Sequence, residues 1–384
     1  MAFLCVSTFL SMMAVHIYIP TLPPYAVSLG ASLTIVGVIS GSFGFSHLLL
    51  RIPFGVISDR CQKRKVFIVL GALAASASGL GFFLSSDPKV FVLWRALAGV
   101  GGATIGLNAV LFAEHFSQTT KAMGFFNFTV ALALAVGPAL GGLLASIWDW
   151  RTPFLAGGAL GLLALMAVFL VWEPQPSAKP SPLPKSMLAE LLNRPLILQA
   201  ILLMSLLTFS QNATIFTFVP VRAFELGAGQ SQLGALIFLT MLVVSLVSLT
   251  SGSIFAQRLS TKWIAGIGFV LVGISALIIP WMNELLGLTL AVLVCGIGWG
   301  MILPMVGTWS LNESPDGTKA TAMGVYLAGG SIGVFLGPVI GGWLADLINP
   351  NAPFLIVGFV CVLTSAWQIA QTLKRQPVLD HHFK

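Results

Sequence analysis

The sequence reads AMGFFNFTVALALAVGPALGG at residues 122–142 and AMGVYLAGGSIGVFLGPVIGG at residues 322–342. The two stretches share their opening AMG and their closing GPxxGG, and further matches between the two parts of the chain recur at an offset of 197 residues. An ordered series at a nearly constant offset indicates an internal duplication, so we expect two halves with the same fold. The positions matched at that offset are Pro23 and Pro220, Leu29 and Leu226, Gly30 and Gly227, Ala31 and Ala228, Gly37 and Gly234, Gly55 and Gly252, Gly99 and Gly296, and Gly101 and Gly298.

The composition places both halves in a membrane. Hydrophobic residues make up 57% of the chain and charged residues only 8%, whereas soluble domains average about 25% charged residues. Lipid cannot satisfy backbone polar groups, so the long apolar stretches are predicted to be helices and not strands. We therefore expect an all-α polytopic membrane protein with twelve transmembrane helices in two pseudo-symmetric six-helix bundles. The expected spans are 3–28, 33–57, 66–86, 90–113, 122–147, 152–172, 196–221, 231–256, 263–282, 286–310, 320–347 and 353–373.

One long connection divides the chain. Residues 173–195 contain six prolines, which is typical of an extended linker. We expect an N-terminal six-helix bundle at 1–172, a cytoplasmic linker at 173–195, and a C-terminal six-helix bundle with a short cytoplasmic tail at 196–384.

The basic residues predict the orientation. With the N-terminus inside, fourteen Lys and Arg residues fall in cytoplasmic segments and three in outer loops, as the positive-inside rule requires. Both termini are therefore expected in the cytoplasm. The net charge of +7 indicates anionic lipid as a partner and does not indicate nucleic acid.

No cofactor is expected from the motifs. The four cysteines, Cys5, Cys61, Cys295 and Cys361, show no metal-binding spacing, and no GxxxxGK[ST] phosphate loop is present. ATP is thus excluded as the energy source on sequence grounds. An intramembrane enzyme is disfavoured because no clustered nucleophile, base or metal set occurs, and a non-transporting sensor because the short linker and tails leave no output domain.

The segment between the second and third spans carries a distinctive motif, GVISDRCQKRK at residues 55–65. It resembles the G-x-x-x-D-R-x-G-R-R/K signature of the major facilitator superfamily, with Gln62 in place of the usual glycine. The resemblance covers nearly the whole chain and implies transport by alternating access. It also implies a conformational switch that latches the cytoplasmic side, built from Gly55, Asp59, Arg60 and Arg64.

The GPxxGG run of span 5 resembles the antiporter motif of the family's exporters. By that resemblance Gly137, Pro138, Gly141 and Gly142 belong to the conformational switch, at the interface where spans 5 and 8 of the two halves meet. Proline bends a helix and glycines allow close approach. Span 8 offers Ser245, Ser248, Ser251 and Gly252 for this interface.

Coupling residues are expected in the first half. Arg95 resembles the R-x-x-x-G motif of span 4, which the family links to proton coupling, and Arg51 is the other charge within a span. Drug/proton exporters of the family usually carry an acid in span 1, but here every Asp and Glu falls at a span end or in a loop. His16 and His47, whose side-chain type titrates near neutral pH, are the expected proton carriers. The structural alternatives are a simple hydrogen bond for each histidine and interfacial snorkelling for each arginine.

Substrate contacts in this architecture come from spans 1, 4, 7 and 10 at mid-depth. The same side chains have an alternative role as ties between helices. The candidates are His16, Asn108, Thr208, Gln211, Asn212 and Trp299.

These observations predict a secondary active transporter of the bacterial inner membrane, resembling the twelve-span drug/proton antiporter branch. We expect a monomer that couples export of a small-molecule substrate to protons. An importer or symporter of an organic anion or nutrient is the alternative, because the missing acid and the Arg and His residues favour anionic or neutral cargo.

Overall fold

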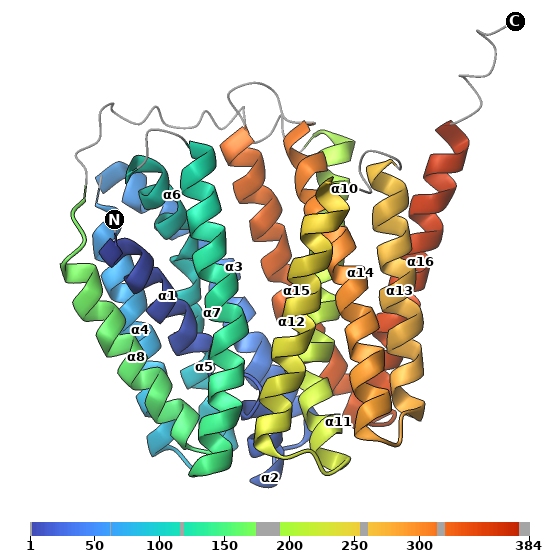
Figure 1. Cartoon of the computed structure of the whole chain (residues 1–384), viewed down its shortest axis with the longest axis horizontal. Coiled ribbons are helices and arrows are strands. Elements are labelled where there is room, and N and C mark those ends of the chain that lie inside the picture. The colour runs from blue at the N-terminus through green and yellow to red at the C-terminus, as the bar shows by residue number, and fades with distance from the viewer. Residues whose placement is uncertain are drawn as a thin grey trace, which may run out of the picture.

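The computed structural model describes residues 2–61, 63–115, 119–173, 193–253, 260–312 and 319–375. Within these ranges the regular secondary structure is helical throughout. Figure 1 shows the helices standing side by side in two groups, one from each half of the chain.

The first half contains six spans, two of which are each built from two helices. α1 and α2 together form the first span, and α5 and α6 form the fourth. The helices are α1 (Ala2–His16), α2 (Leu22–Ser28), α3 (Leu33–Cys61), α4 (Arg64–Leu84), α5 (Pro88–Ala103), α6 (Ile105–His115), α7 (Thr119–Ile147) and α8 (Thr152–Phe169).

The second half repeats this order. Its first span consists of α10, a π-helical turn η1 and α11, and a 3-10 turn η3 ends the third. The elements are α10 (Pro195–Ala213), η1 (Thr214–Phe218), α11 (Val219–Glu225), α12 (Gln230–Ser253), α13 (Thr261–Ile278), η3 (Ile279–Trp281), α14 (Leu285–Asn312), α15 (Lys319–Leu347) and α16 (Ala352–Arg375).

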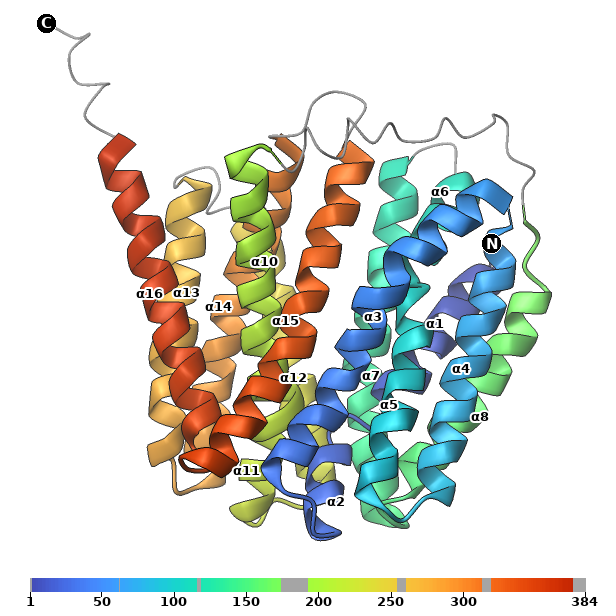
Figure 2. The ribbon, with the colours of Figure 1, turned by 180° about the vertical axis from the view of Figure 1, so that it is seen from behind.

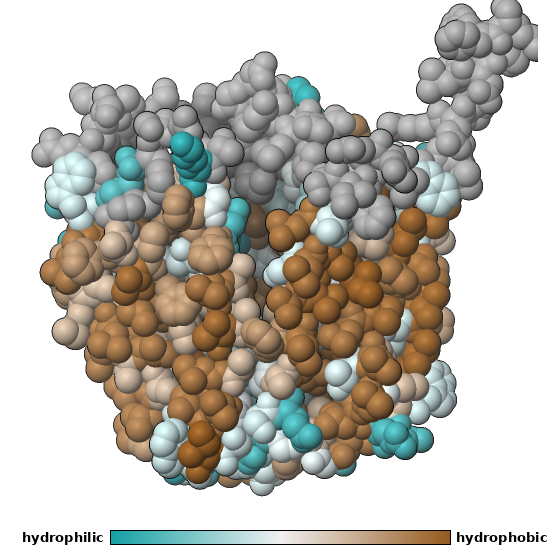
Figure 3. All heavy atoms as spheres, viewed as in Figure 1, coloured by the Kyte–Doolittle hydropathy of each residue, from teal (hydrophilic) through white to brown (hydrophobic). Residues whose placement is uncertain are grey.

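The prediction of a polytopic helical membrane protein is confirmed. Eleven of the described helical stretches are long and apolar enough to cross a membrane, and α1 is a shorter apolar helix whose span α2 completes. Large apolar side chains lie on the outside, among them Leu84, Trp172 and Leu249. Figure 3 shows this apolar surface as a broad band across both halves on the side facing the viewer. Such a surface is stable against lipid tails and not against water.

The two faces of the molecule have different roles below. We call the face where α8 leads to Glu173 and α10 begins the linker face, and the face that holds α2 and α11 the opposite face. Figure 2 shows α3 and α15 close together near the opposite face and diverging toward the linker face.

The halves meet along two seams made by glycines. In the first seam, between α3 and α15, a Cβ built on Gly37 would lie 3.1 Å from Gly342 Cα. In the second, between α7 and α12, a Cβ on Gly142 would lie 2.8 Å from Gly234 Cα. Gly37 and Gly234 are repeat equivalents, as are Gly142 and Gly342. The duplicated glycines therefore pair crosswise between the halves, and small residues let the backbones approach.

Toward the linker face the halves separate. A Cβ on Gly55, Gly124 or Gly324 would meet nothing within 4 Å, although these glycines lie on α3, α7 and α15, the helices of the two seams. Figure 3 shows a hollow between the halves in the part of the molecule nearer this face. The structure is thus closed at the opposite face and open at the linker face.

Candidate substrate and coupling site

The first span of each half is interrupted at an equivalent position. α1 ends at His16 and α10 at Ala213, which is the 197-residue offset of the repeat. The chain then turns through residues 17–21 before α2, and through η1 before α11. π-Helical turns are frequent at functional sites, and interrupted spans at matching positions of two repeats point to a transporter's binding site.

Sequence reasoning missed both interruptions, because residues 3–28 and 196–221 were predicted as continuous helices. The available signals were Pro20 and Pro220, since proline lacks the N–H that a continuous helix needs. Hydropathy alone cannot reveal such a break, because the interrupting residues are as apolar as the helices on either side.

Arg95 is buried beside the break in the first half. Its side chain on α5 is 6% exposed, and Nη1 donates to the Val15 carbonyl oxygen of α1 at 3.0 Å. The guanidinium carbon lies 4.4 Å from the ring centre of Phe43 and 5.6 Å from that of Tyr18. Aromatic faces and a backbone carbonyl therefore stabilise this charge.

Phe43 also contacts both predicted coupling histidines. Its ring centre lies 6.1 Å from that of His16 and 4.4 Å from that of His47. His16 Nδ1 lies 2.7 Å from the Met12 carbonyl oxygen, so this nitrogen carries the proton that is donated. His47 Nε2 is buried with no hydrogen-bond partner. A buried polar atom without a partner among the described residues is unusual in a native structure and calls for an explanation, such as a functional role or an ordered water.

Arg51 completes a basic cluster, which we define as His16, His47, Arg51 and Arg95. Arg51 lies on α3, and its Nη1 donates to the Leu327 carbonyl oxygen of α15 at 3.0 Å, across the two halves. His47 interacts electrostatically with the other three members. Every Asp and Glu within the described ranges lies at a helix end or between helices. The positive charge of the cluster is therefore that of Arg51 and Arg95, with no neighbouring carboxylate among the placed side chains.

The predicted polar substrate contacts divide into two groups. Asn108 accepts from Thr8 Oγ1 at 3.3 Å, Thr208 Oγ1 donates to the Gly330 carbonyl oxygen at 2.7 Å, and Trp299 Nε1 donates to Ser210 Oγ at 2.9 Å. These three are buried and tie neighbouring helices together. Gln211 and Asn212 are only half-buried and lie immediately before the break in α10, so they are better placed to meet a substrate in this state.

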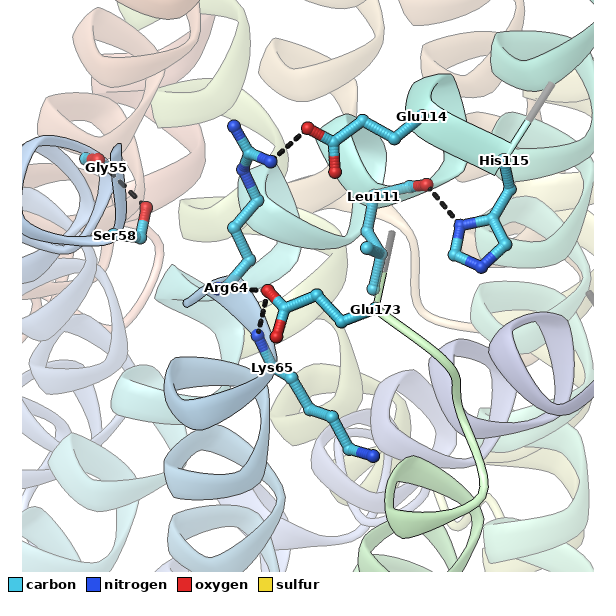
Figure 4. A network of polar contacts seen from close by, with 8 residues as sticks. All are labelled: Gly55, Ser58, Arg64, Lys65, Leu111, Glu114, His115 and Glu173. Carbon is cyan, nitrogen blue, oxygen red and sulfur yellow. Dashed lines mark hydrogen bonds and ion pairs between the residues drawn. The ribbon is translucent and has the colours of Figure 1, made fainter. Parts of the chain in front are cut away.

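The motif between α3 and α4 binds within its own half here. Arg64 N–H donates to Glu173 Oε1 at 2.5 Å, and the Arg64 guanidinium pairs with Glu114 at the end of α6 (Figure 4). Lys65 Nζ donates to the Phe169 and Val171 carbonyl oxygens at 2.8 and 2.7 Å. Of the predicted latch residues, Arg60 is exposed, and a Cβ built on Gly55 would meet no atom within 4 Å. The side chain of Asp59 lies outside the described residues.

The GPxxGG run requires a correction. A Cβ on Gly141 would lie 1.7 Å from the Ile17 carbonyl oxygen, and one on Gly137 would lie 3.6 Å from Ile17 N. Gly137 and Gly141 of α7 thus face the turn after α1 within the first half. Pro138 and Gly142 do lie at the other half, because a Cβ on Gly234 would lie 2.7 Å from the Pro138 carbonyl oxygen and 3.0 Å from Gly142 Cα. Adjacent helix positions point about 100° apart, so a motif spanning several positions cannot serve a single interface.

Span 8 differs from expectation for the same reason. Ser248 and Ser251 of α12 both donate to the Gly300 carbonyl oxygen of α14, inside the second half. The contact between α12 and α7 is formed instead by Gly234 and the backbone of Gln230.

Metal ligation finds no support in the described side chains. No group of three or more His, Cys, Asp or Glu among them is placed to hold a metal ion, and all four cysteines are free. The chemistry available at the site is hydrogen bonding, charge attraction and proton exchange.

Comparison with known proteins identifies relatives over the whole chain. The family model described as Major Facilitator Superfamily matches residues 4–309 and 201–381. The inner membrane transport protein YajR of Escherichia coli is 26% identical, with 97% of this chain and 82% of that protein covered. The quinolone resistance protein NorA of Staphylococcus aureus is 25% identical, with 91% of each chain covered.

A solved structure shares the fold. The crystal structure of the nucleoside transporter NupG superposes with a TM-score of 0.79, covering 97% of this chain and 98% of that one, at 14% identity. The two six-helix groups are therefore arranged here as they are in that transporter.

Proposed function

Because the chain belongs to the Major Facilitator Superfamily, we propose that this membrane transporter exports a small molecule across the bacterial inner membrane, driven by protons. The observation that carries alternating access is the unequal closure of the two faces. Glycine seams hold the halves together at the opposite face, while the same helices are apart at the linker face. A rocking of one half against the other would reverse this arrangement.

Export is supported by the antiporter-type GPxxGG run and by similarity to NorA, whose name is that of a resistance protein. The positive-inside distribution favours a cytoplasmic linker face with both termini inside, so that the open hollow would admit cargo from the cytoplasm. We further propose that the unit of transport is a single chain, since each half supplies one interrupted span to the site.

Proton coupling is assigned to the histidines of the basic cluster. In inverted vesicles, export of a fluorescent cargo should depend on a proton gradient, and adding cargo should move protons across proteoliposomes. We expect His47→Gln to abolish cargo-driven proton movement while cargo binding falls less than about threefold, because binding does not require the exchanged proton. His16→Gln and the double substitution extend the series.

His115→Gln is the matched control, because His115 lies at the end of α6, contacts the Leu111 carbonyl oxygen (Figure 4), and is not a member of the basic cluster. Proton movement that persists at the parental rate in the double histidine variant would contradict the assignment. Cargo transport without any proton movement in the parent protein would contradict proton coupling itself.

A second candidate is transport of an organic anion, and the basic cluster favours it. The two arginines of the cluster, without a neighbouring placed carboxylate, create a potential that attracts negative charge. The same vesicles should therefore be offered cationic, neutral and carboxylate-bearing cargos of similar size. Preference for the carboxylate, weakened in Arg51→Gln, would favour this candidate over export of cationic drugs.

A further inference from the structure

The first seam contains a carboxylate that joins the halves at the opposite face. Asp346 lies in the last turn of α15, and both of its oxygens accept hydrogen bonds from the start of α3. The Leu33 N–H donates to Oδ1 at 3.1 Å and the Thr34 N–H to Oδ2 at 2.9 Å. The hydroxyls of Ser32 and Thr34 also contact this carboxylate. One side chain of the second half thus caps a helix of the first.

The position suits a negative charge. The first N–H groups of a helix have no partner within the helix, and the helix dipole places partial positive charge there. Hydrogen bonds to a carboxylate are stronger than those between neutral groups. Because the acceptor comes from the other half, these bonds exist only while the two halves are together at this face.

The backbone around Asp346 is built for close approach. A Cβ on Gly342 would lie 2.3 Å from the Leu33 carbonyl oxygen, and Thr34 Oγ1 donates to the Gly342 carbonyl oxygen at 3.3 Å. Gly342 precedes Asp346 by one helical turn, so both residues lie on the same side of α15. The glycine allows the contact and the carboxylate then stabilises it.

The second seam lacks this carboxylate. The repeat equivalent of Asp346 is Ser146, which donates to the Leu143 carbonyl oxygen of its own helix α7 at 2.8 Å. Just before α12, the Gly229 N–H donates to Oε1 of Gln232, which lies in the first turn of that helix, at 2.8 Å. The two seams therefore share the glycine packing and differ in the charged cap.

From this difference we infer that Asp346 is a latch that holds the opposite face closed, and that the seam between α3 and α15 is the one that switches. The other end of α3, at the linker face, carries Asp59, and the repeat equivalent of Asp59 is Ala256. Asp59 and Asp346 thus both belong to the pair of helices α3 and α15. The sequence has no acid at either equivalent position of the second repeat pair. The inference rests on the proposed alternating access, but it depends on neither the cargo nor the coupling ion.

The test measures the two faces separately, without transport. Spin labels at Lys89 and Glu284 report the width of the opposite face, and labels at Lys121 and Ser260 that of the linker face; all four residues are exposed. The labels are introduced in a background without native cysteines. Asp346→Ala should raise the ratio of molecules open at the opposite face to those closed there at least about tenfold, or 1.4 kcal/mol. The linker-face distances should shorten in the same molecules.

A backbone variant tests the donor side of the contact. Leu33 is the first residue of α3, a position where proline is well tolerated, so Leu33→Pro removes one N–H donor without breaking the helix. It should shift the distances in the same direction as Asp346→Ala. Leu33→Ala controls for the lost side chain and should shift them less.

Two further variants serve as a control and as a rescue. Asp149→Ala removes an exposed acid at the same face whose bond, to the Arg151 N–H, is local, and should change neither distance. Ser146→Asp supplies the missing acid to the second seam and should restore closure in the Asp346→Ala background. Unchanged distance distributions in both Asp346→Ala and Leu33→Pro would overturn the latch. If the parent protein exports no cargo but Asp346→Ala and Leu33→Pro still shift the distances as expected, the proposed function is contradicted and the latch is not.

Discussion

At the scale of one residue, Arg95 is a charge buried inside the first half. Its charge is buried against the rings of Phe43 and Tyr18, and it contacts the Tyr18 hydroxyl and the Val15 carbonyl oxygen, but no placed carboxylate pairs with it. A cation over an aromatic ring gains about 2 kcal/mol when desolvated, whereas removing a charge from water costs several kcal/mol. On these magnitudes the balance is unfavourable, which is consistent with the role in transport proposed for the basic cluster.

We therefore expect Arg95→Met to stabilise the protein and to abolish transport. Methionine fills similar space without the charge, so the free energy of unfolding should rise by about 1–3 kcal/mol. Thermal unfolding in detergent would show a midpoint higher by a few degrees, beside a transport assay in vesicles. Arg95→Lys keeps the charge and should not stabilise. A lower midpoint for Arg95→Met would show that the ring and carbonyl contacts outweigh desolvation.

At the scale of one element, α7 places adjacent glycines in different interfaces. Gly141→Ala would bring Cβ against the Ile17 carbonyl oxygen inside the first half, and Gly142→Ala would bring it against Gly234 of the second. We expect Gly141→Ala to lower the free energy of unfolding by about 1–3 kcal/mol, since overpacking strains a fixed contact. Gly142→Ala should instead widen the opposite face with less effect on the unfolding midpoint, because the halves can separate there. Midpoints and spin-label distances would distinguish the two, and equal loss of stability in both variants would contradict this division.

Sequence reasoning predicted the elements better than their details. Long apolar stretches bounded by charges and Gly or Pro locate twelve spans within a few residues, because crossing a membrane imposes both length and polarity. The breaks after His16 and Ala213 were missed, since their residues are apolar. The residues of the basic cluster are evident in the sequence, but their common contact with Phe43 depends on how helices pack. The bonds of Asp346 could not be predicted, because they join residues more than 300 positions apart.

For the whole molecule, the charge distribution predicts which face meets the cytoplasm. We expect alkaline phosphatase fused after Asp87 or Gly229, at the opposite face, to be active, because this enzyme folds only outside the cytoplasm. Fusion at the C-terminus should be inactive, and green fluorescent protein at that site should fluoresce. The reverse pattern would show that the linker face lies outside, and would contradict the proposed cytoplasmic position of the termini.

The crosswise pairing of Gly37 with Gly342 and of Gly234 with Gly142 has a consequence for ancestry. A patch that contacts its own equivalent across a twofold axis is the mark of an isologous dimer. The two halves contact each other as two copies of one six-helix protein would, so the fused chain preserves the interface of an ancestral homodimer. In such a dimer a carboxylate at the position of Asp346 would have capped both seams at once. In the fused chain the two copies can differ, and here only the seam between α3 and α15 has the acid, whereas the equivalent position of the other seam is Ser146.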